Sequence, residues 1–303
     1  MIAKVGVLCT RVRVEEKQLI KTLADAGVPA LPLAPTSLPL PICPGPPKPF
    51  FAPANDGTVA EVMIDRCQNR AVAAALLPVW RAKGVRVIDA GVAAISDRLA
   101  TAMALAAAGI PRPLTDLVCA EDAALLALDR CGYPATFLPL APGSKEIVLI
   151  DEDTAEAVFE HRHVLGAKAD LIGLVQTGIA LGSDRVTVIV VDGVAVAVDS
   201  HDHDVPKAAY GLAELAAKAL GASLIGIEVA HMAAGAVVWN VNPIPDFRDA
   251  IALGETTVAE AIAKLAVEWA GSLRPDAIAV ELLDDGQGGA LGREVPDDVA
   301  LSA

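Results

Sequence analysis

The chain has 303 residues, of which 54% are hydrophobic and only 3% aromatic, and its formal net charge is −14. This length is sufficient for two or three compact lobes, each with its own hydrophobic core. The acidic balance argues against nonspecific nucleic-acid binding, which needs a basic surface. No apolar run reaches the roughly 18–20 residues of a membrane span, and the N-terminus lacks a signal-peptide pattern. We therefore expect a cytoplasmic protein with no nucleic-acid or membrane partner.

The N-terminal part of the chain alternates between strand and helix patterns. An apolar strand over 3–9 is followed by a helix over 14–26 and a strand over 28–33. A second strand–helix–strand set covers 61–89, and this order predicts a parallel sheet. The proline-rich run 34–53 separates the two sets and cannot form a helix or a central strand. We interpret it as an extended linker, and the alternative is a motif for a proline-reading domain.

The middle of the chain predicts a small lobe of mixed helices and strands. Residues 91–109 predict one helix that ends at a glycine and contains Arg98. The loop 141–145 reads Ala-Pro-Gly-Ser-Lys, so its backbone N–H groups and Lys145 suit a phosphate, although such loops are also common hairpin turns. A strand near 171–179 carries Gln176. The remaining elements expected in this part are a helix over 121–130, a strand over 147–150 and a helix over 154–163.

A hairpin and a cluster of ionisable residues follow. The Asp-Gly turn at 192–193 joins two apolar strands within 186–198, and Arg185 stands at the entrance of the first. His201 and His203 lie in the run Ser-His-Asp-His-Asp. Two histidines flanked by aspartates suit a transition metal, and a solvated turn is the alternative that we favour. An amphipathic helix is expected over 206–220.

The stretch 222–248 predicts two strands joined by a short turn. Glu228 stands near the end of the first strand, and Asn240 and Asn242 stand on the second. Because these asparagines are two residues apart, they point to the same face of a strand. A carboxylate opposite two oxygen-bearing side chains suits a hard cation such as Mg²⁺, with phosphates completing its shell. A last helix over 256–270 and an acidic, glycine-containing tail over 273–303 are expected to end the chain.

The order and wording of these segments resemble the ATP-grasp ligases, in particular the RimK-like branch that joins amino acids to carboxylates. The similarity spans roughly residues 60–270 and is carried by Asp65-Arg66-Cys67, Ala108-Gly109-Ile110-Pro111-Arg112-Pro113-Leu114-Thr115, Gly132-Tyr133-Pro134 and Trp239-Asn240-Val241-Asn242. The resemblance implies an α/β protein in which two antiparallel sheets enclose ATP. The expected divisions are a parallel-sheet pre-ATP-grasp lobe over 1–90, a first ATP-grasp part with the small α+β lobe over 91–180, an antiparallel-sheet lobe over 181–272, and the tail.

The resemblance also implies roles for individual residues, with Mg-ATP as the cofactor of an active enzyme. The implied nucleotide contacts are Arg98, Lys145, Gln176 and Arg185, and the implied metal ligands are Glu228, Asn240 and Asn242. A solvated helix arginine is the alternative for Arg98, and a plain core strand is the alternative around Gln176. No catalytic residue is assigned.

Four positions depart from the pattern that the resemblance implies. Where it expects a lysine that grips ATP, a hinge glutamate, a phosphate-facing arginine and a metal-binding glutamate, this chain has Leu138, Thr177, Thr187 and Asn240. Losing one preorganised charged group in a water-excluded site costs on the order of 10²–10³ in rate. Several such replacements predict little of the ordinary chemistry, although the effects do not add.

Three hypotheses follow. The first is a degenerate ATP-grasp protein, a pseudoenzyme that acts without a cofactor or with weakly bound nucleotide, beside a partner ligase subunit in a cofactor or amino-acid ligation pathway. The second is an active carboxylate–amine ligase that adds glutamate or another amino acid to a small-molecule cofactor, such as a one-carbon cofactor, or to a peptide or carrier protein. The third is a dimer-forming scaffold, since alanine-rich helix faces allow the close packing of a homo-oligomer.

Overall fold

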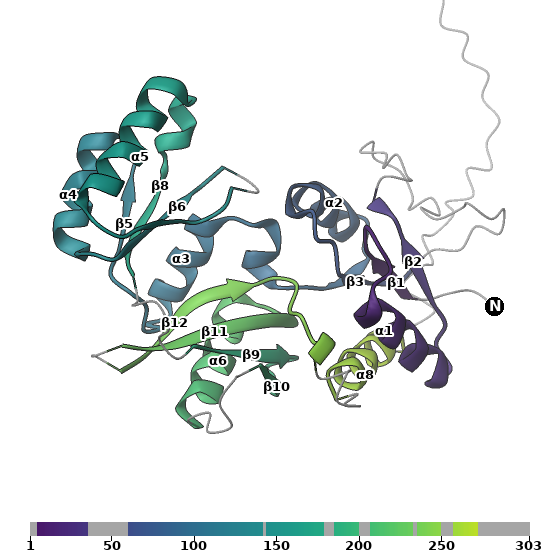
Figure 1. The fold of residues 1–303 in the computed structure, drawn as a ribbon. Coiled ribbons are helices and arrows are strands. Elements are labelled where there is room, and N and C mark those ends of the chain that lie inside the picture. Colours follow the sequence, from purple (N-terminus) through teal and green to yellow (C-terminus); the bar gives the residue numbers. More distant parts are fainter. Residues whose placement is uncertain are drawn as a thin grey trace, which may run out of the picture.

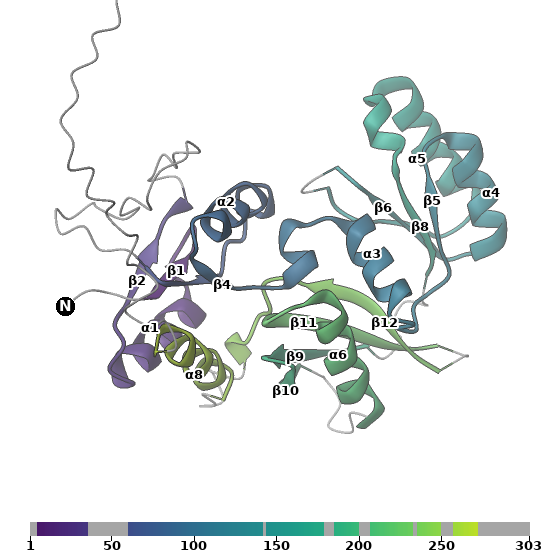
Figure 2. The ribbon, with the colours of Figure 1, turned by 180° about the vertical axis from the view of Figure 1, so that it is seen from behind.

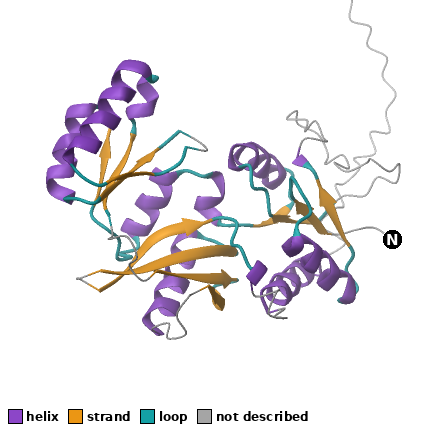
Figure 3. Ribbon diagram, viewed as in Figure 1, coloured by secondary structure: helices purple, strands orange, loops and turns teal. Residues whose placement is uncertain are grey.

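The computed structural model describes residues 5–35, 60–141, 144–178, 185–199, 207–232, 235–249 and 257–271. These residues form three four-stranded sheets with helices packed against them (Figure 3). Within them, none of the helices has the length and apolarity needed to span a lipid bilayer. Most of the proline-rich run, His201 and His203, and the tail over 273–303 lie outside the described residues.

The first sheet is parallel, as the alternating pattern predicted. Its strands are β1 (Val5–Leu8), β2 (Ala30–Leu33), β3 (Val62–Asp65) and β4 (Arg86–Ile88), in the order β2-β1-β3-β4. The helices of this lobe are α1 (Val14–Asp25) and α2 (Arg70–Ala82). The central strands β1 and β3 are buried along their whole length, which is why both are apolar except for Asp65 at the end of β3, where Asp65 pairs with Arg70.

The last described helix, α8 (Thr257–Gly271), returns to this first lobe and packs on α1 and β3 (Figure 1). One apolar cluster joins α1, α8, β1 and β3 to Ile189, Val191 and Leu224 of the third sheet. The N-terminal lobe and the third sheet therefore share a hydrophobic core. A single core of this kind holds the two parts in a defined relative position.

The second sheet is antiparallel and forms the small lobe. Its strands are β5 (Thr115–Val118), β6 (Ala135–Pro139), β7 (Ile147–Leu149) and β8 (Gly173–Thr177), in the order β5-β8-β6-β7. The helices α4 (Glu121–Cys131) and α5 (Glu152–Leu165) share an apolar core with one face of this sheet. Phe137 and Phe159 meet edge to face there, with ring centroids 5.0 Å apart. Because side chains alternate along a strand, the other face is free to line a site.

The third sheet is also antiparallel. Its strands are β9 (Arg185–Val191), β10 (Val194–Asp199), β11 (Leu224–Met232) and β12 (Gly235–Asn242), in the order β10-β9-β11-β12. The helix α6 (Lys207–Leu220) packs beneath it. The register between β11 and β12 shifts between Glu228 and Val229, so that Trp239 is the extra residue on the edge strand.

The connection between the first and second lobes differs from the sequence prediction. Instead of one helix over 91–109, the structure has a short 3-10 helix, η2 (Gly91–Ile95), and a separate helix, α3 (Arg98–Ala107). Ser96 has a left-handed conformation with φ 55°, and the Asp97 side chain accepts a hydrogen bond from the Ala100 N–H. An N-cap directly after a left-handed residue starts a new helix. The single long helix was therefore a wrong prediction.

The separate start of α3 places it between the small sheet and β12 (Figure 2). The predicted fold class, with one parallel and two antiparallel sheets, is confirmed.

A buried arginine also fixes the chain after β12 to the first lobe. Arg66 donates hydrogen bonds to Glu16 Oε1 at 3.0 Å and to the Pro245 carbonyl at 2.8 Å. Its guanidinium lies 5.0 Å from the Phe247 ring centroid.

Candidate functional site

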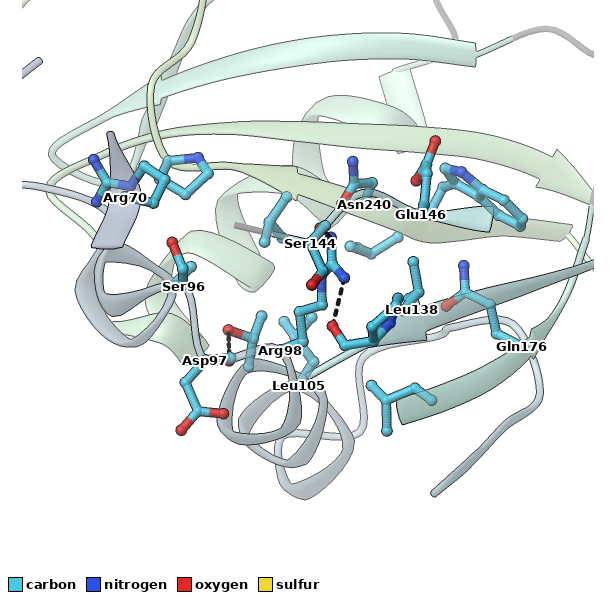
Figure 4. A pocket seen from close by; sticks show the side chains of 18 of the residues that line it. Arg70, Ser96, Asp97, Arg98, Leu105, Leu138, Ser144, Glu146, Gln176 and Asn240 are labelled. Carbon is cyan, nitrogen blue, oxygen red and sulfur yellow. Dashed lines mark hydrogen bonds between the residues drawn. The ribbon is translucent and has the colours of Figure 1, made fainter. Parts of the chain in front are cut away.

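A cavity of about 300 Å³ lies between the second and third sheets, over the start of α3 (Figure 4). Leu138, Leu174 and Gln176 line it from the small sheet, and Trp239 and Asn240 line it from β12. Its volume is at the lower end of the range for small-molecule sites, which is about 300–1,000 Å³. The cavity brings together segments more than 100 residues apart in the sequence.

Gln176 is the most deeply buried polar side chain of this cavity. It is 2% exposed, and its Oε1 atom has no hydrogen-bond partner among the described residues. Figure 4 shows its side chain beside Leu138 at the cavity wall. A buried carbonyl oxygen without a partner costs about 1–3 kcal/mol, so this group is poised to accept a hydrogen bond. The predicted core strand around it is confirmed as β8, while its predicted role toward a nucleotide stays a prediction.

Arg98 begins α3 and reaches across to the small lobe. Its guanidinium donates to the Pro139 carbonyl at 2.6 Å and to the Ser144 carbonyl at 2.7 Å. Burial lowers the pKa of Arg98 from its usual value. The alternative of a solvated arginine does not hold, because the side chain joins α3 to the last residue of β6, Pro139, and to Ser144 in the connection to β7. The predicted phosphate contact would compete with these two hydrogen bonds.

Arg112 lines the cavity and was not among the predicted site residues. Its Nε atom is buried and has no hydrogen-bond partner in the described parts of the chain, and burial lowers the pKa of Arg112 from its usual value. The segment before it is fixed to the third sheet, since the Val238 N–H donates to the Pro111 carbonyl at 2.9 Å. A charged residue between two prolines, at 111–113, was the only signal in the sequence, and a solvated turn gives the same signal.

A third arginine at the cavity is already neutralised. Arg70 pairs with Asp65 at 2.9 Å, donates to the Cys67 carbonyl at 2.8 Å and also contacts the Ala94 carbonyl. With Arg70 balanced by Asp65, the remaining lining charges are Arg98 and Arg112 against the two acids Asp97 and Glu146. The charges therefore nearly cancel, whereas a triphosphate needs a strong excess of positive charge.

The three predicted metal ligands lie on neighbouring strands, as the strand pattern implied. Glu228 and Asn240 face each other across β11 and β12. However, the Glu228 carboxylate is 3.0 Å from the Arg185 guanidinium, and their side chains are 22% and 46% exposed. The Asn242 Oδ1 atom accepts a hydrogen bond from the Ile244 N–H at 3.0 Å. Arg185, the predicted phosphate contact, is thus paired with Glu228, the predicted metal ligand.

These residues do not fit an Mg²⁺ ion bound to a triphosphate. Magnesium sites use carboxylates and phosphate oxygens around the ion, and here the one carboxylate is paired with a cation and one amide is used within its own turn. Throughout the described part of the chain, no group of three or more His, Cys, Asp or Glu side chains is placed to hold a metal. The side chains predicted to bind Mg²⁺ therefore fit the ion poorly, whether or not the cavity accepts the base of a nucleotide.

Two further sequence predictions can be placed. Lys145 is exposed and stands between Ser144 and Glu146, which both line the cavity. Leu138, which replaces the expected lysine, is part of the cavity wall. An apolar side chain there cannot neutralise phosphate charge. The part of the cavity wall where the sequence resemblance implied a lysine is thus apolar.

Comparison with known structures identifies the fold. The chain is 28% identical to an ATP-grasp RimK domain protein from Sphaerobacter thermophilus, with 87% of this chain and 99% of that chain covered and a TM-score of 0.73. The ATP-grasp ligase PsnB, in complex with a precursor peptide and AMPPNP, has a TM-score of 0.66 at 14% identity over 89% of this chain and 98% of that chain.

D-alanine–D-alanine ligase from Bacillus anthracis, complexed with ATP, has a TM-score of 0.60 at 14% identity over 89% of this chain and 99% of that chain. No protein-family model matches the sequence. The chain has the ATP-grasp ligase fold, as the sequence resemblance predicted, and the solved structure from Sphaerobacter thermophilus confirms the similarity to RimK-like proteins.

Proposed function

We propose that this chain is a non-catalytic ATP-grasp protein, or one that binds nucleotide only weakly, which serves a cofactor or amino-acid ligation pathway. The observation that carries this proposal is the ion pair between Arg185 and Glu228 at 3.0 Å. In this arrangement a cation and a carboxylate that would hold phosphate and magnesium satisfy each other. Leu138 in the cavity wall removes a further positive charge.

The physical demand of the ligase reaction supports this proposal. Phosphoryl transfer depends almost entirely on positioning and on neutralising charge in a site that excludes water. Arg98 is held by two carbonyl oxygens, and Arg70 is paired with Asp65. Each of these groups would have to give up its present partner before it could contact phosphate. The cost of such exchanges raises the barrier instead of lowering it.

An active carboxylate–amine ligase is the second candidate, and one observation favours it. The match to the RimK domain protein covers 99% of that chain, so the lobes that such an enzyme needs are all represented. In this case Mg-ATP would be the cofactor, and the substrate would be a carboxylate on a small molecule, a peptide or a carrier protein. If the chain is instead non-catalytic, a partner ligase subunit would carry out the ligation reaction.

Thermal unfolding with 5 mM Mg-ATP and with 5 mM Mg-ADP separates the two candidates. A nucleotide at 100 times its Kd adds about 2.7 kcal/mol of stability, which raises Tm by roughly 5–10 °C in a protein of this size. We expect a rise below about 2 °C, which corresponds to a Kd near or above the nucleotide concentration.

The variant Glu228→Ala tests whether any rise depends on the proposed metal ligand, and Glu156→Ala on the exposed face of α5 is the control. A rise of 5 °C or more that Glu228→Ala abolishes and Glu156→Ala retains would refute the non-catalytic proposal. Release of ADP and phosphate in the presence of a carboxylate and an amine would refute it as well.

A further inference from the structure

Among the described residues, three side chains that line the inter-sheet cavity have a buried polar atom without a hydrogen-bond partner: Arg70, Arg112 and Gln176. Arg70 is already paired with Asp65, so Arg112 and Gln176 remain, and their unpaired atoms are of complementary kinds. The Gln176 Oε1 atom is an acceptor on a side chain that is 2% exposed, and the Arg112 Nε–H is a buried donor. Both line the same cavity of about 300 Å³. Buried polar groups are nearly always satisfied in folded proteins, so the exceptions indicate what a ligand has to provide.

The Arg112 side chain defines one end of such a ligand. Its guanidinium has Nε unsatisfied, burial lowers its pKa, and no acidic group contributes to that shift. An arginine fork fits a carboxylate through two parallel N–H···O bonds. With Arg112 counted, the lining charges cancel, so the cavity has no excess positive charge for a triphosphate with its metal, and the single Arg112 guanidinium suits an anion of one charge.

Gln176 and the apolar walls of the cavity define the rest of the ligand. An acceptor oxygen needs a donor on the ligand, such as a hydroxyl or amino group. Leu138 and Leu174 line the cavity from the small sheet, and Trp239 lines it from the bulge of β12. Apolar side chains and one indole favour a flat, apolar body, and the cavity volume limits that body to about one or two rings.

We propose that the inter-sheet cavity binds a small aromatic monocarboxylate without a divalent cation. Arg112 binds its carboxylate, and Gln176 accepts a hydrogen bond from a hydroxyl or amino group on its ring. This assignment rests on the proposed non-catalytic function, because it places an organic anion where an active ligase would hold Mg-ATP. It makes the protein a carrier or sensor for such a carboxylate.

The test is isothermal titration calorimetry of the full chain in buffer that contains EDTA. The probe is 4-hydroxybenzoate, with two matched analogues: benzoate lacks the donor for Gln176, and 4-hydroxybenzamide lacks the charge for Arg112. We expect 4-hydroxybenzoate to bind with a Kd below 1 mM and each analogue to bind at least about 10-fold more weakly. Magnesium added in place of EDTA leaves the affinity unchanged.

Variants assign the two contacts. Arg112→Gln is expected to weaken 4-hydroxybenzoate at least about 10-fold and to leave 4-hydroxybenzamide unchanged. Gln176→Leu is expected to remove the difference between 4-hydroxybenzoate and benzoate. Arg130→Gln is the control for the arginine substitution, because Arg130 is on α4 with a side chain that is 62% exposed. Urea unfolding of each variant shows that loss of binding is not loss of fold.

The proposal is overturned if 4-hydroxybenzoate does not bind at 10 mM, if its binding requires Mg²⁺, or if Arg112→Gln binds it as well as the unmodified chain. These outcomes differ from the failure of the proposed function. A non-catalytic chain that ignores all three probes refutes only the ligand assignment. A chain that turns over ATP refutes the proposed function, whatever the titration with 4-hydroxybenzoate shows.

Discussion

Replacing Gln176 with leucine should stabilise this protein in the absence of ligand. The side chain is 2% exposed, and its Oε1 atom has no hydrogen-bond partner among the described residues. Its cross-strand partner on β6 is Thr136, and Leu174 and Leu138 form the next pair on the same, cavity-lining face of the small sheet. Leucine has a similar volume, so the substitution removes the unsatisfied oxygen without creating a large void.

The expected magnitude follows from the cost of that oxygen. An unsatisfied buried acceptor costs about 1–3 kcal/mol, and leucine removes this cost while adding apolar contact with its neighbours. The free energy of unfolding should therefore rise by about 1–3 kcal/mol. At roughly 2–4 °C per kcal/mol for a protein of this size, Tm should rise by roughly 2–12 °C. Such a gain is typical where a binding group is kept at the expense of stability.

Urea unfolding, followed by circular dichroism without ligand, measures this change. The control is Gln18→Leu on α1, at a partly exposed position, where surface substitutions usually stay within about 0.5 kcal/mol. A destabilisation of more than 1 kcal/mol for Gln176→Leu would show that the amide is satisfied in solution, by a buried water or another group. In that case, the argument from the unpaired oxygen fails.

Three other substitutions test the frame around the cavity. Burial raises the pKa of Asp89 from 3.8 to about 6. The unfolded chain therefore loses this proton first as the pH rises, and the contribution of Asp89 to stability falls by about 3 kcal/mol between pH 4 and pH 6 and is flat above. The Tm of the unmodified chain minus the Tm of Asp89→Asn should therefore fall as the pH rises from 4 to 6 and stay constant above pH 6. Arg98→Gln removes two hydrogen bonds to carbonyls and should lower the free energy of unfolding in urea by about 2–3 kcal/mol. Gly91 has φ +58°, and an added Cβ would lie 2.0 Å from the Leu220 carbonyl oxygen, so Gly91→Ala should cost about 2–4 kcal/mol in the same assay.

Two of these substitutions, Arg98→Gln and Gly91→Ala, have a matched control. Arg130→Gln removes an exposed arginine and should change stability by less than 1 kcal/mol. Gly211 lies in α6 with open space around its missing Cβ, so Gly211→Ala should stabilise the helix by about 0.5–1 kcal/mol. The argument about Asp89 fails if the Tm of the unmodified chain minus that of Asp89→Asn rises with pH. The argument about Arg98 fails if Arg98→Gln and Arg130→Gln change the free energy of unfolding equally.

Much of the architecture was predictable because it depends on local patterns. The apolar runs at β1 and β3 predicted buried parallel strands, and the Asp-Gly turn predicted the hairpin of β9 and β10. The placement of Glu228 opposite Asn240 also followed from the strand pattern. The split of the expected helix over 91–109 did not, since a left-handed serine has no sequence signal as strong as glycine.

The amino-acid sequence by itself determined the three sheets and most of their helices, because periodicity and residue type are local properties. It also placed the neutral residues Leu138 and Thr187 where the family resemblance implied charged ones. Only the tertiary structure decided which charges meet. Arg185 pairs with Glu228 from another strand, and Arg98 binds two carbonyls of the small lobe. The Nε atom of Arg112 is buried at the cavity with no partner among the residues that the structure describes. A charge acquires its role from the neighbours that folding brings within a few ångströms of it, and these neighbours are distant in the sequence.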